Sequence, residues 1–231
     1  HDALPIYEVK TDGNLESKKT EVTKMGNAWN HFCTITSHKI LVMKGCFKVG
    51  LYRQGLLHDL SKYSPTEFLV GCKYYQGDKS PNGIEREKLG YSSAWLHHKG
   101  RNKHHLEYWL DYGMNKTSGG AREHGGICGM KMPVNYVVEM YIDRVCASKN
   151  YLKERYTSDC PLQYYSTGKE FYIMHEDTRA LLELLLVMLS LRGEDVVNDF
   201  IRKGILTGIV PYEKKKLDDM QEELWEYPRE K

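Results

Sequence analysis

The sequence predicts an all-α protein. Apolar residues recur at the three- and four-residue spacing of helices in several long segments, and no segment of any length has the two-residue period of a strand. With 231 residues, the chain is long enough to bury a core as one domain. We expect a flexible arm at residues 1–20, a helical domain at 21–208 and a charged helical tail at 209–231.

The first part of the domain is predicted to hold three helices. Apolar spacing indicates the first two, and the second of these carries a His-Asp pair near its C-terminal end. Ser64, Pro65 and Glu67 have the order of a helix start, in which serine caps the helix and glutamate closes a capping box. The expected helices are 21–45, 46–60 and 65–75.

Polar and glycine-rich segments separate the remaining elements. Residues 76–90 are predicted to be a polar loop. Residues 112–132 are predicted to be a long loop, and a loop of that length in a compact domain is usually functional or mobile. A partly helical segment between them should bend at Gly100. The helical segments expected in this part are 91–109, 133–152, 176–191, 194–204 and 212–226.

Composition restricts the class of function. The net charge of +2 argues against binding nucleic acid by bulk electrostatics. The longest apolar run, Ala180–Leu191, is interrupted by Glu183 and is shorter than the roughly 18 residues of a membrane span. Six scattered cysteines without a C-x-x-C pair predict reduced thiols in a cytoplasmic protein. The oligomeric state is left open, a homo-oligomer included.

The adjacent residues His58 and Asp59 are the most informative motif. Neutral imidazole suits Mn, Fe, Co, Ni or Zn, and carboxylate adds charge and suits harder cations such as Mg. The alternative is a helix-terminal pair in which the carboxylate accepts only surface hydrogen bonds. His38 and Asp143 are candidates to complete a metal site, because a carboxylate on the mostly apolar helix 133–152 needs a partner. Glu139, one turn before Asp143, is expected to orient a ligand.

A second concentration of histidines lies at residues 97–105, together with three basic residues. Neighbouring helical residues point about 100° apart, so at most one histidine of each adjacent pair is expected to face a given ion. The seven-residue spacing between the two pairs lets either set align on one face. The candidates for a second ion or for acid–base catalysis are His97, His98, His104 and His105.

Three basic residues are candidates to bind a substrate phosphate, with an exposed basic surface as the alternative: Lys62, Arg101 and Lys103.

His31 lies seven residues before His38, which is about 10 Å along a helix. Metal–nitrogen bonds are about 2.1 Å long, so both can hardly bind one ion. His31 is therefore expected to serve a second metal, to line the pocket or to be a satisfied histidine.

The order H…HD…H…D resembles the HD-domain superfamily of metal-dependent phosphohydrolases. The runs CFKVGLYRQGLLHDLSKYSPTEF, AWLHHKGRNKHHLEYW and MPVNYVVEMYIDRVCASKNY resemble a family of bacterial and phage proteins over roughly residues 24–203. The resemblance implies an HD-domain-like helical bundle with one or two divalent transition metal ions in its core. It also implies hydrolysis of a nucleotide or other small phosphate ester by a metal-activated water. The ligands that it implies are His38, His58, Asp59 and Asp143.

Two other functions fit the same residues. Some HD-like folds use the order H…HD…H…H…D to bind two irons and activate dioxygen. Six protein ligands would favour such a di-iron oxygenase, whereas lysine and arginine residues suited to phosphate argue against it. The third alternative is a non-catalytic binding or regulatory module that keeps its metal for stability or as a sensor.

Overall fold

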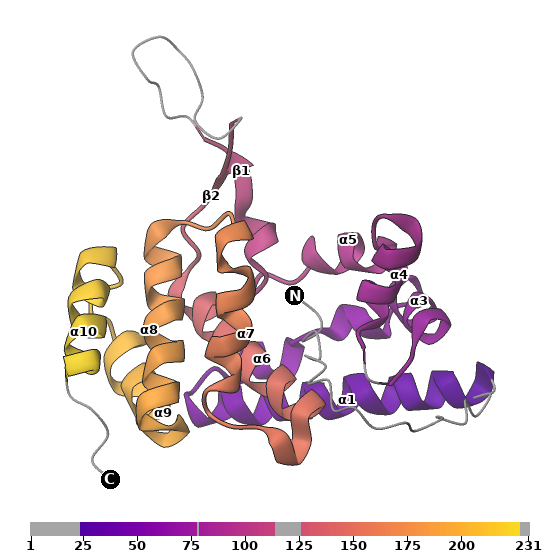
Figure 1. Ribbon diagram of the computed structural model, residues 1–231, viewed down its shortest axis with the longest axis horizontal. Coiled ribbons are helices and arrows are strands. Elements are labelled where there is room, and N and C mark those ends of the chain that lie inside the picture. Colours follow the sequence, from indigo (N-terminus) through magenta and orange to yellow (C-terminus); the bar gives the residue numbers. More distant parts are fainter. Residues whose placement is uncertain (1–23, 78, 114–125, 227–231) are drawn as a thin grey trace, which may run out of the picture.

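The computed structural model describes residues 24–77, 79–113 and 126–226, and this part of the chain is almost entirely helical (Figure 1). The β structure within these ranges is one antiparallel hairpin, in which β1 (Leu110–Tyr112) pairs with β2 (Ile127–Gly129). The predicted all-α class is therefore confirmed. The arm expected at residues 1–20 lies outside the described residues.

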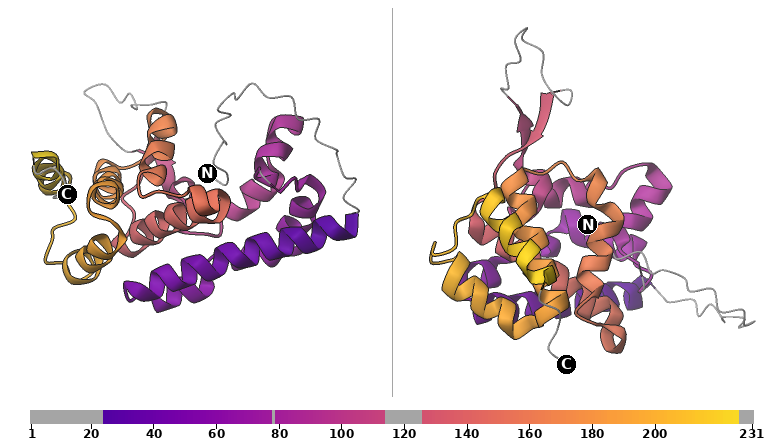
Figure 2. Two further views of the ribbon diagram at one scale, coloured as in Figure 1. Left: turned by 60° about the horizontal axis from the view of Figure 1, so that its bottom comes forward. Right: turned by 60° about the vertical axis from the view of Figure 1, so that its left-hand side comes forward.

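The longest helix, α1, runs along the molecule, and the other helices gather beside it (Figures 1 and 2). The N-terminal half consists of α1 (Lys24–Lys48), α2 (Tyr52–Leu57), the 3-10 turn η1 (Leu60–Tyr63), α3 (Pro65–Tyr74), α4 (Pro81–Leu89), α5 (Ser93–Lys99) and the turn η2 (Leu106–Trp109). Helices α3, α4 and α5 pack on one another, and α3 also packs on α1.

The C-terminal half adds a second group of helices at the other end of α1 (Figure 1). Its elements are α6 (Val134–Leu152), η4 (Lys153–Arg155), α7 (Cys160–Gly168), η5 (Lys169–Phe171), α8 (Glu176–Arg192), α9 (Glu194–Phe200), the π-helical turn η6 (Ile201–Ile205) and α10 (Lys214–Glu226). Helix α6 packs against both α1 and α8, so it joins the two groups.

Helix α8 forms the centre of the core. Its leucines from Leu181 to Leu189 are fully buried, as expected for a helix that is apolar on every side. Each such side chain stabilises the fold by about 1.5–3 kcal/mol. Helix α10 packs on α8, and its Leu217 is fully buried, so residues 214–226 of the predicted tail are part of the packed body. None of the described helices combines the length and apolarity needed to cross a membrane.

The helix predicted over residues 46–60 is wrong in its boundaries. Helix α1 continues to Lys48 and ends before Gly50, whose φ of +89° favours glycine and reverses the chain. The short α2 then starts at Tyr52 and ends before His58. The predicted helix 46–60 is thus interrupted at Gly50 and ends before the His-Asp pair, although its apolar spacing is continuous.

Two helices were missed because their start and stop signals lie in polar sequence. The loop predicted over residues 76–90 contains α4, which has Pro81 in its first turn and Gly90 at its C-cap with φ +81°. This is the usual asymmetry of proline at the start and glycine at the end of a helix. Helix α7 likewise has Pro161 in its first turn. The apolar pattern of both helices is short, so proline in the first turn indicates these helices more clearly than apolar spacing does.

Helices α1 and α6 approach each other closely at Gly45. A Cβ atom placed there would lie 2.7 Å from Cγ2 of Ile142 on α6, closer than real Cβ contacts allow. A β-branched side chain cannot move this methyl group without a rotamer change. The glycine therefore sets the distance between the two helices that carry His38 and Asp143.

We expect Gly45→Ala to lower the free energy of unfolding by about 1–2 kcal/mol, because overpacking outweighs the gain in helix propensity of about 1 kcal/mol. Gly83→Ala on α4 is the matched control, since a Cβ there meets nothing within 4 Å. Urea denaturation of the three proteins measures the difference. Equal stabilisation by both substitutions would show that the contact at Gly45 is not tight.

Candidate metal centre

The His-Asp pair lies in the break between α2 and the turn η1. His58 caps the C-terminus of α2, and Asp59 follows in the left-handed conformation with φ 54° and ψ 25°. Few residues other than glycine tolerate this conformation, and aspartate is one of them. The turn directs both side chains into the interior, where each residue is 2% exposed. Lys62 follows on η1, outside the helix that ends before His58.

One group of side chains that could hold a metal ion joins α1, the His-Asp break and α6. Nε2 of His38 lies 2.8 Å from Oδ1 of Asp143. Nε2 of His58 lies 3.5 Å from the same oxygen and 3.3 Å from Oδ2 of Asp59. The four residues each offer one ligand atom, and these atoms all lie within 4.8 Å of one another. The structure thus brings together the four residues that the sequence grouped.

A second group shares Asp59 and adds three histidines. Oδ1 of Asp59 lies 3.3 Å from Nε2 of His98 and 3.4 Å from Nε2 of His104. Nε2 of His105 lies 2.9 Å from Nε2 of His98. These four ligand atoms also lie within 4.8 Å of one another. Asp59 therefore presents one oxygen to each group, which is the arrangement of a carboxylate between two neighbouring ion positions.

At most one histidine of each adjacent pair was expected to face a given ion, and the two pairs differ in the structure. His98 lies in the second group, whereas His97 is outside it and hydrogen-bonds to Glu67 at 2.6 Å. His104 and His105 both belong to the second group. The chain between Gly100 and His105 is a series of turns, so the 100° rule of a helix does not apply there.

Two buried carboxylates orient the histidines from outside. Oε1 of Glu139 lies 3.0 Å from Nδ1 of His58 and 3.2 Å from Nδ1 of His104. Oε2 of Glu67 lies 2.8 Å from Nδ1 of His98. An imidazole that donates its Nδ1 proton to a carboxylate keeps the Nε2 lone pair for a metal. Glu139 thus lies where the sequence placed an orienting residue.

Glu67 is the site residue that sequence reasoning missed. The predicted capping box is wrong, because the Ser64 side chain makes no capping hydrogen bond and Glu67 turns into the interior, where it is 6% exposed. A glutamate at the third position of a helix suits either role. Only the packing of α3 against α5, which carries His97 and His98, decides between them.

The side chains fit a metal ion. Nε2 of His58, Nε2 of His104 and Oδ1 of Asp59 are buried and have no hydrogen-bond partner within the described residues. Such orphaned polar atoms are costly and call for a ligand. Bonds of about 2.1 Å to one ion place neighbouring ligand atoms about 3.0–3.4 Å apart. The spacings between the ligand atoms given above, from 2.8 to 3.5 Å, are close to that range.

The electrostatics of the cluster keep its carboxylates ionised. Burial alone would raise the pKa of Asp59, but His58, Lys62 and His98 hold it well below its usual range. Burial would also raise the pKa of Asp143, but His38 and His58 hold this pKa well below its usual range. Burial, with His104 and His98 nearby, keeps the pKa of His105 well below its ordinary value, so this imidazole is neutral. Opposed by burial, Asp59 and the neighbouring carboxylates raise the pKa of His58 well above its ordinary value and that of His98 to about 9. A metal ion that binds the neutral imidazoles and ionised carboxylates would therefore displace protons from these two histidines.

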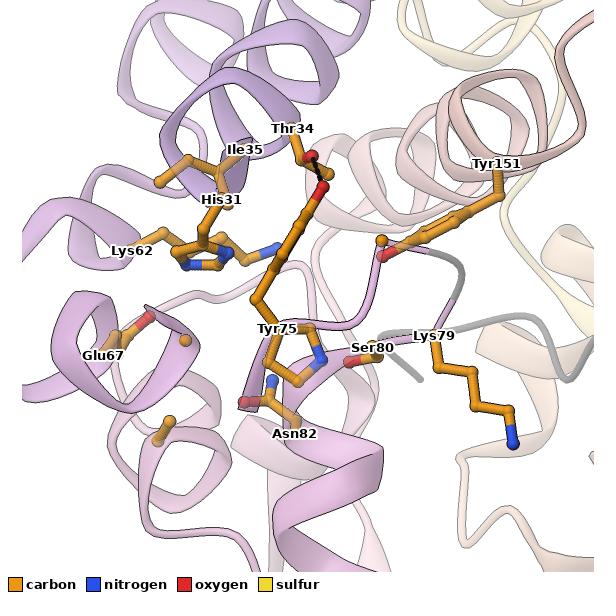
Figure 3. Close-up of a pocket in the computed structure, with 14 residues that line it drawn as sticks. His31, Thr34, Ile35, Lys62, Glu67, Tyr75, Lys79, Ser80, Asn82 and Tyr151 are labelled. Carbon is orange, nitrogen blue, oxygen red and sulfur yellow. Dashed lines mark hydrogen bonds between the residues drawn. The ribbon is translucent and has the colours of Figure 1, made fainter. Parts of the chain in front are cut away.

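One opening to the cluster leads past Lys62. A cavity of about 390 Å³ is lined by Lys62, His38 and Asp143, and it shares Thr34, Ile35, Lys62 and Tyr151 with a neighbouring cavity of about 550 Å³. His31 lines the larger cavity beside Lys62 and outside both metal-binding groups (Figure 3). Burial and the charge of Lys62 lower the pKa of His31 to about 4. Of the three roles considered for His31, the structure favours lining the pocket.

The other two predicted phosphate-binding residues lie elsewhere. Arg101 and Lys103 line a separate cavity of about 840 Å³, together with His104 and Glu139. Lys62 does not line this cavity, and its ammonium lies 2.9 Å from Oδ2 of Asp59. The structure therefore divides into two sets the basic residues that the sequence grouped for one phosphate.

The start of α5, the helix that carries His97 and His98, is fixed by Glu85 on α4. The Ser92 and Ser93 hydroxyls each donate to the Glu85 carboxylate at 2.7 Å, and the Ser92 oxygen accepts from the backbone N–H of Trp95. Burial would raise the pKa of Glu85, but these hydroxyls and the backbone N–H groups of Ser93 and Ala94 lower it overall.

We expect Glu85→Gln to lower the free energy of unfolding by about 1–2 kcal/mol at pH 7, because bonds to a charged acceptor are lost. A folded-state pKa below the unfolded one gives a contribution that is complete above the unfolded pKa of about 4.3 and disappears as the pH falls through the folded pKa. The difference from wild type should therefore shrink below pH 4. Denaturation at several pH values tests this, with exposed Glu87→Gln as the control; a pH-independent difference would contradict it.

Comparison with known proteins identifies the family of this chain and says nothing of its function. Residues 27–188, which include all the donors above, match the model of DUF5662, described as a family of unknown function. No curated protein and no solved structure matches the sequence significantly. Since the match covers most of the sequence, the chain belongs to the DUF5662 family.

Proposed function

We propose that this protein is a metal-dependent phosphohydrolase acting on a nucleotide or other small phosphate ester. The observation that carries the proposal is the pair of buried metal-binding groups that share Asp59. The proposed cofactor is one or two divalent transition metal ions, Mn, Fe, Co, Ni or Zn, with Mg as a further candidate. The HD-domain-like order of the ligands in the sequence supports the same chemistry.

The residues divide into two proposed ion positions. His38, His58, Asp59 and Asp143 would hold the first ion. Asp59, His98, His104 and His105 would hold the second. When bound, the ions supply Lewis-acid stabilisation of phosphoryl oxygens and lower the pKa of a nucleophilic water.

Lys62 is the proposed phosphate-binding residue of this chain. Its ammonium pairs with Asp59, and its side chain lines both connected cavities beside the first group. A cation at this place offsets the charge of a phosphoryl group as the bond to the leaving oxygen breaks. The ammonium would thus neutralise phosphate charge from a fixed position, whereas in water mobile counterions do so.

The larger of the two connected cavities supports a small organic leaving group. Tyr75 and Tyr151 supply aromatic surface, and Asn82 supplies an amide for hydrogen bonding (Figure 3). The Tyr75 hydroxyl is held at 2.9 Å from Thr34, which fixes the ring. Tyr75 is one of the aromatic residues that could stack on a nucleobase.

Metal content is the first test. We expect about one or two transition metal ions per chain in protein purified without a His-tag or chelator, and a loss of metal in Asp59→Asn. Asparagine also tolerates the left-handed backbone at this position, so the variant removes the charged ligand with little strain. Elemental analysis measures the content, and exposed Asp219→Asn is the control.

Equal metal content in wild type and Asp59→Asn would contradict the proposed site. The absence of metal from both proteins, even after reloading, would leave the non-catalytic module as the function that fits. Metal loss should also lower the melting temperature, because an ion that binds only the folded chain stabilises it.

Hydrolysis by the metal-loaded protein is the second test. We expect release of phosphate from a panel of nucleotides and small phosphate esters, and a fall in kcat of about 10²–10³ in Lys62→Gln, because a fixed charge at the phosphoryl group is lost. Metal content should stay unchanged. Lys73→Gln, on the exposed side of α3, is the control. Full activity of Lys62→Gln would show that this residue has no part in the mechanism. The absence of activity on every ester tested would contradict the proposed phosphohydrolase function.

The number of donors also favours the di-iron oxygenase as a second candidate. Seven side chains supply the two groups, which meets the expectation of at least six protein ligands. The same elemental analysis separates the candidates. Two irons per chain with oxygen uptake would support the oxygenase, and Mn, Co, Ni or Mg with phosphate release would support the phosphohydrolase.

A further inference from the structure

The cavity of about 840 Å³ lies against the orienting side of the histidine cluster. Its inner wall includes His58, His104 and Glu139, which meet at the two Nδ1 atoms. Its outer wall is basic. Arg53 comes from α2, and Arg101 and Lys103 come from the turns after α5.

None of these three basic side chains has a carboxylate partner within the described ranges. Arg101 donates one hydrogen bond, to the backbone oxygen of His97 at 3.2 Å. The ammonium of Lys103 lies over the rings of Tyr108 and Tyr136, at 5.7 and 5.9 Å. All three residues are exposed, so their charges are hydrated at present and free to be neutralised by a ligand.

The carboxylate in the wall does not compensate these charges. Glu139 accepts from both imidazoles, and burial opposed by His104 and His58 leaves its pKa below the ordinary value. The negative charge of Glu139 is therefore directed at the two imidazoles, and the residue is only 4% exposed. The remaining polar side chains of the wall are uncharged: the amides of Gln54, Asn102 and Asn135 and the phenol of Tyr136.

The proposed metal positions use the Nε2 atoms of the two histidines that line this cavity. Nε2 of His58 and of His104 faces Asp59, whereas Nδ1 of each faces Glu139. The cavities beside Lys62 share no lining residue with this cavity. An anion held by the exposed side chains of Arg53, Arg101 and Lys103 would bind at the solvent side of the cavity, in front of the buried Glu139, and would replace no proposed metal ligand.

We infer that this cavity is a second anion-binding site, for the phosphate group of a small phosphorylated molecule or for free phosphate. Two guanidinium groups suit bidentate contacts with phosphate oxygens, and the lysine adds a point charge. The cavity is concave and carries only three cations, which suits a small ligand rather than a nucleic-acid backbone. The inference does not depend on the proposed hydrolase activity.

Calorimetric titration of inorganic phosphate into the metal-loaded protein tests the inference. We compare wild type with Arg53→Gln/Arg101→Gln, and with Arg86→Gln/Lys215→Gln as a control that removes the same charge from exposed positions elsewhere. Phosphate that binds at the metal ions contributes equally to all three proteins. The difference between the two double variants therefore reports the second site alone.

We expect the Arg53/Arg101 variant to lose at least about tenfold in affinity at this site, with the control unchanged and the metal content equal. Binding to wild type should weaken with added salt, because the contacts are ionic. Arg101→Lys should keep part of the affinity. Equal phosphate binding by all three proteins would overturn the inference, as would loss of all binding when only Lys62 is replaced. Binding that persists in protein stripped of metal would support it and would stand even if no ester is hydrolysed.

Discussion

The rest of the site depends on the buried carboxylate of Asp59. Its left-handed backbone ends α2 and turns both the carboxylate and the His58 imidazole inward. One oxygen then faces the group completed by Asp143, and the other faces the histidines of α5 and of the turns after it. A carboxylate so deeply buried is costly unless cations or donors surround it. The helices α1, α5 and α6 are packed so that their polar side chains meet this one charge.

A layer of orienting groups makes this arrangement specific. Glu139 fixes two imidazoles and Glu67 a third, so that each Nε2 atom points into the cluster. Such outer carboxylates set the ring orientation and raise the basicity of the ligands. Helices α3 and α4 contribute to the second group although they carry none of its ligands. Helix α3 carries Glu67, and Glu85 on α4 fixes the start of α5.

The positive charges are distributed on two sides of this layer. Lys62 pairs with Asp59 at the opening next to the first group, where a reacting phosphate would lie. Arg101 and Lys103 lie across the layer from the metal-facing atoms, around a separate cavity. The two sets of basic residues line cavities that have no lining residue in common, and Glu139 with its two imidazoles belongs to the wall of the second cavity alone.

The sequence by itself determined the all-α class and the long helices, because apolar periodicity is a local signal. The four residues of the first group were named from the order H…HD…H…D and its resemblance to HD domains, and the packing of the helices brings them together. It did not determine the role of Glu67, since a capping glutamate and an inward-facing one have the same position in a helix. It could not show that His104 and His105 both face inward, because that depends on a turn with no helical period. The separation of Lys62 from the two other cations was decided by tertiary packing alone, as side chains far apart in sequence meet only when the helices assemble.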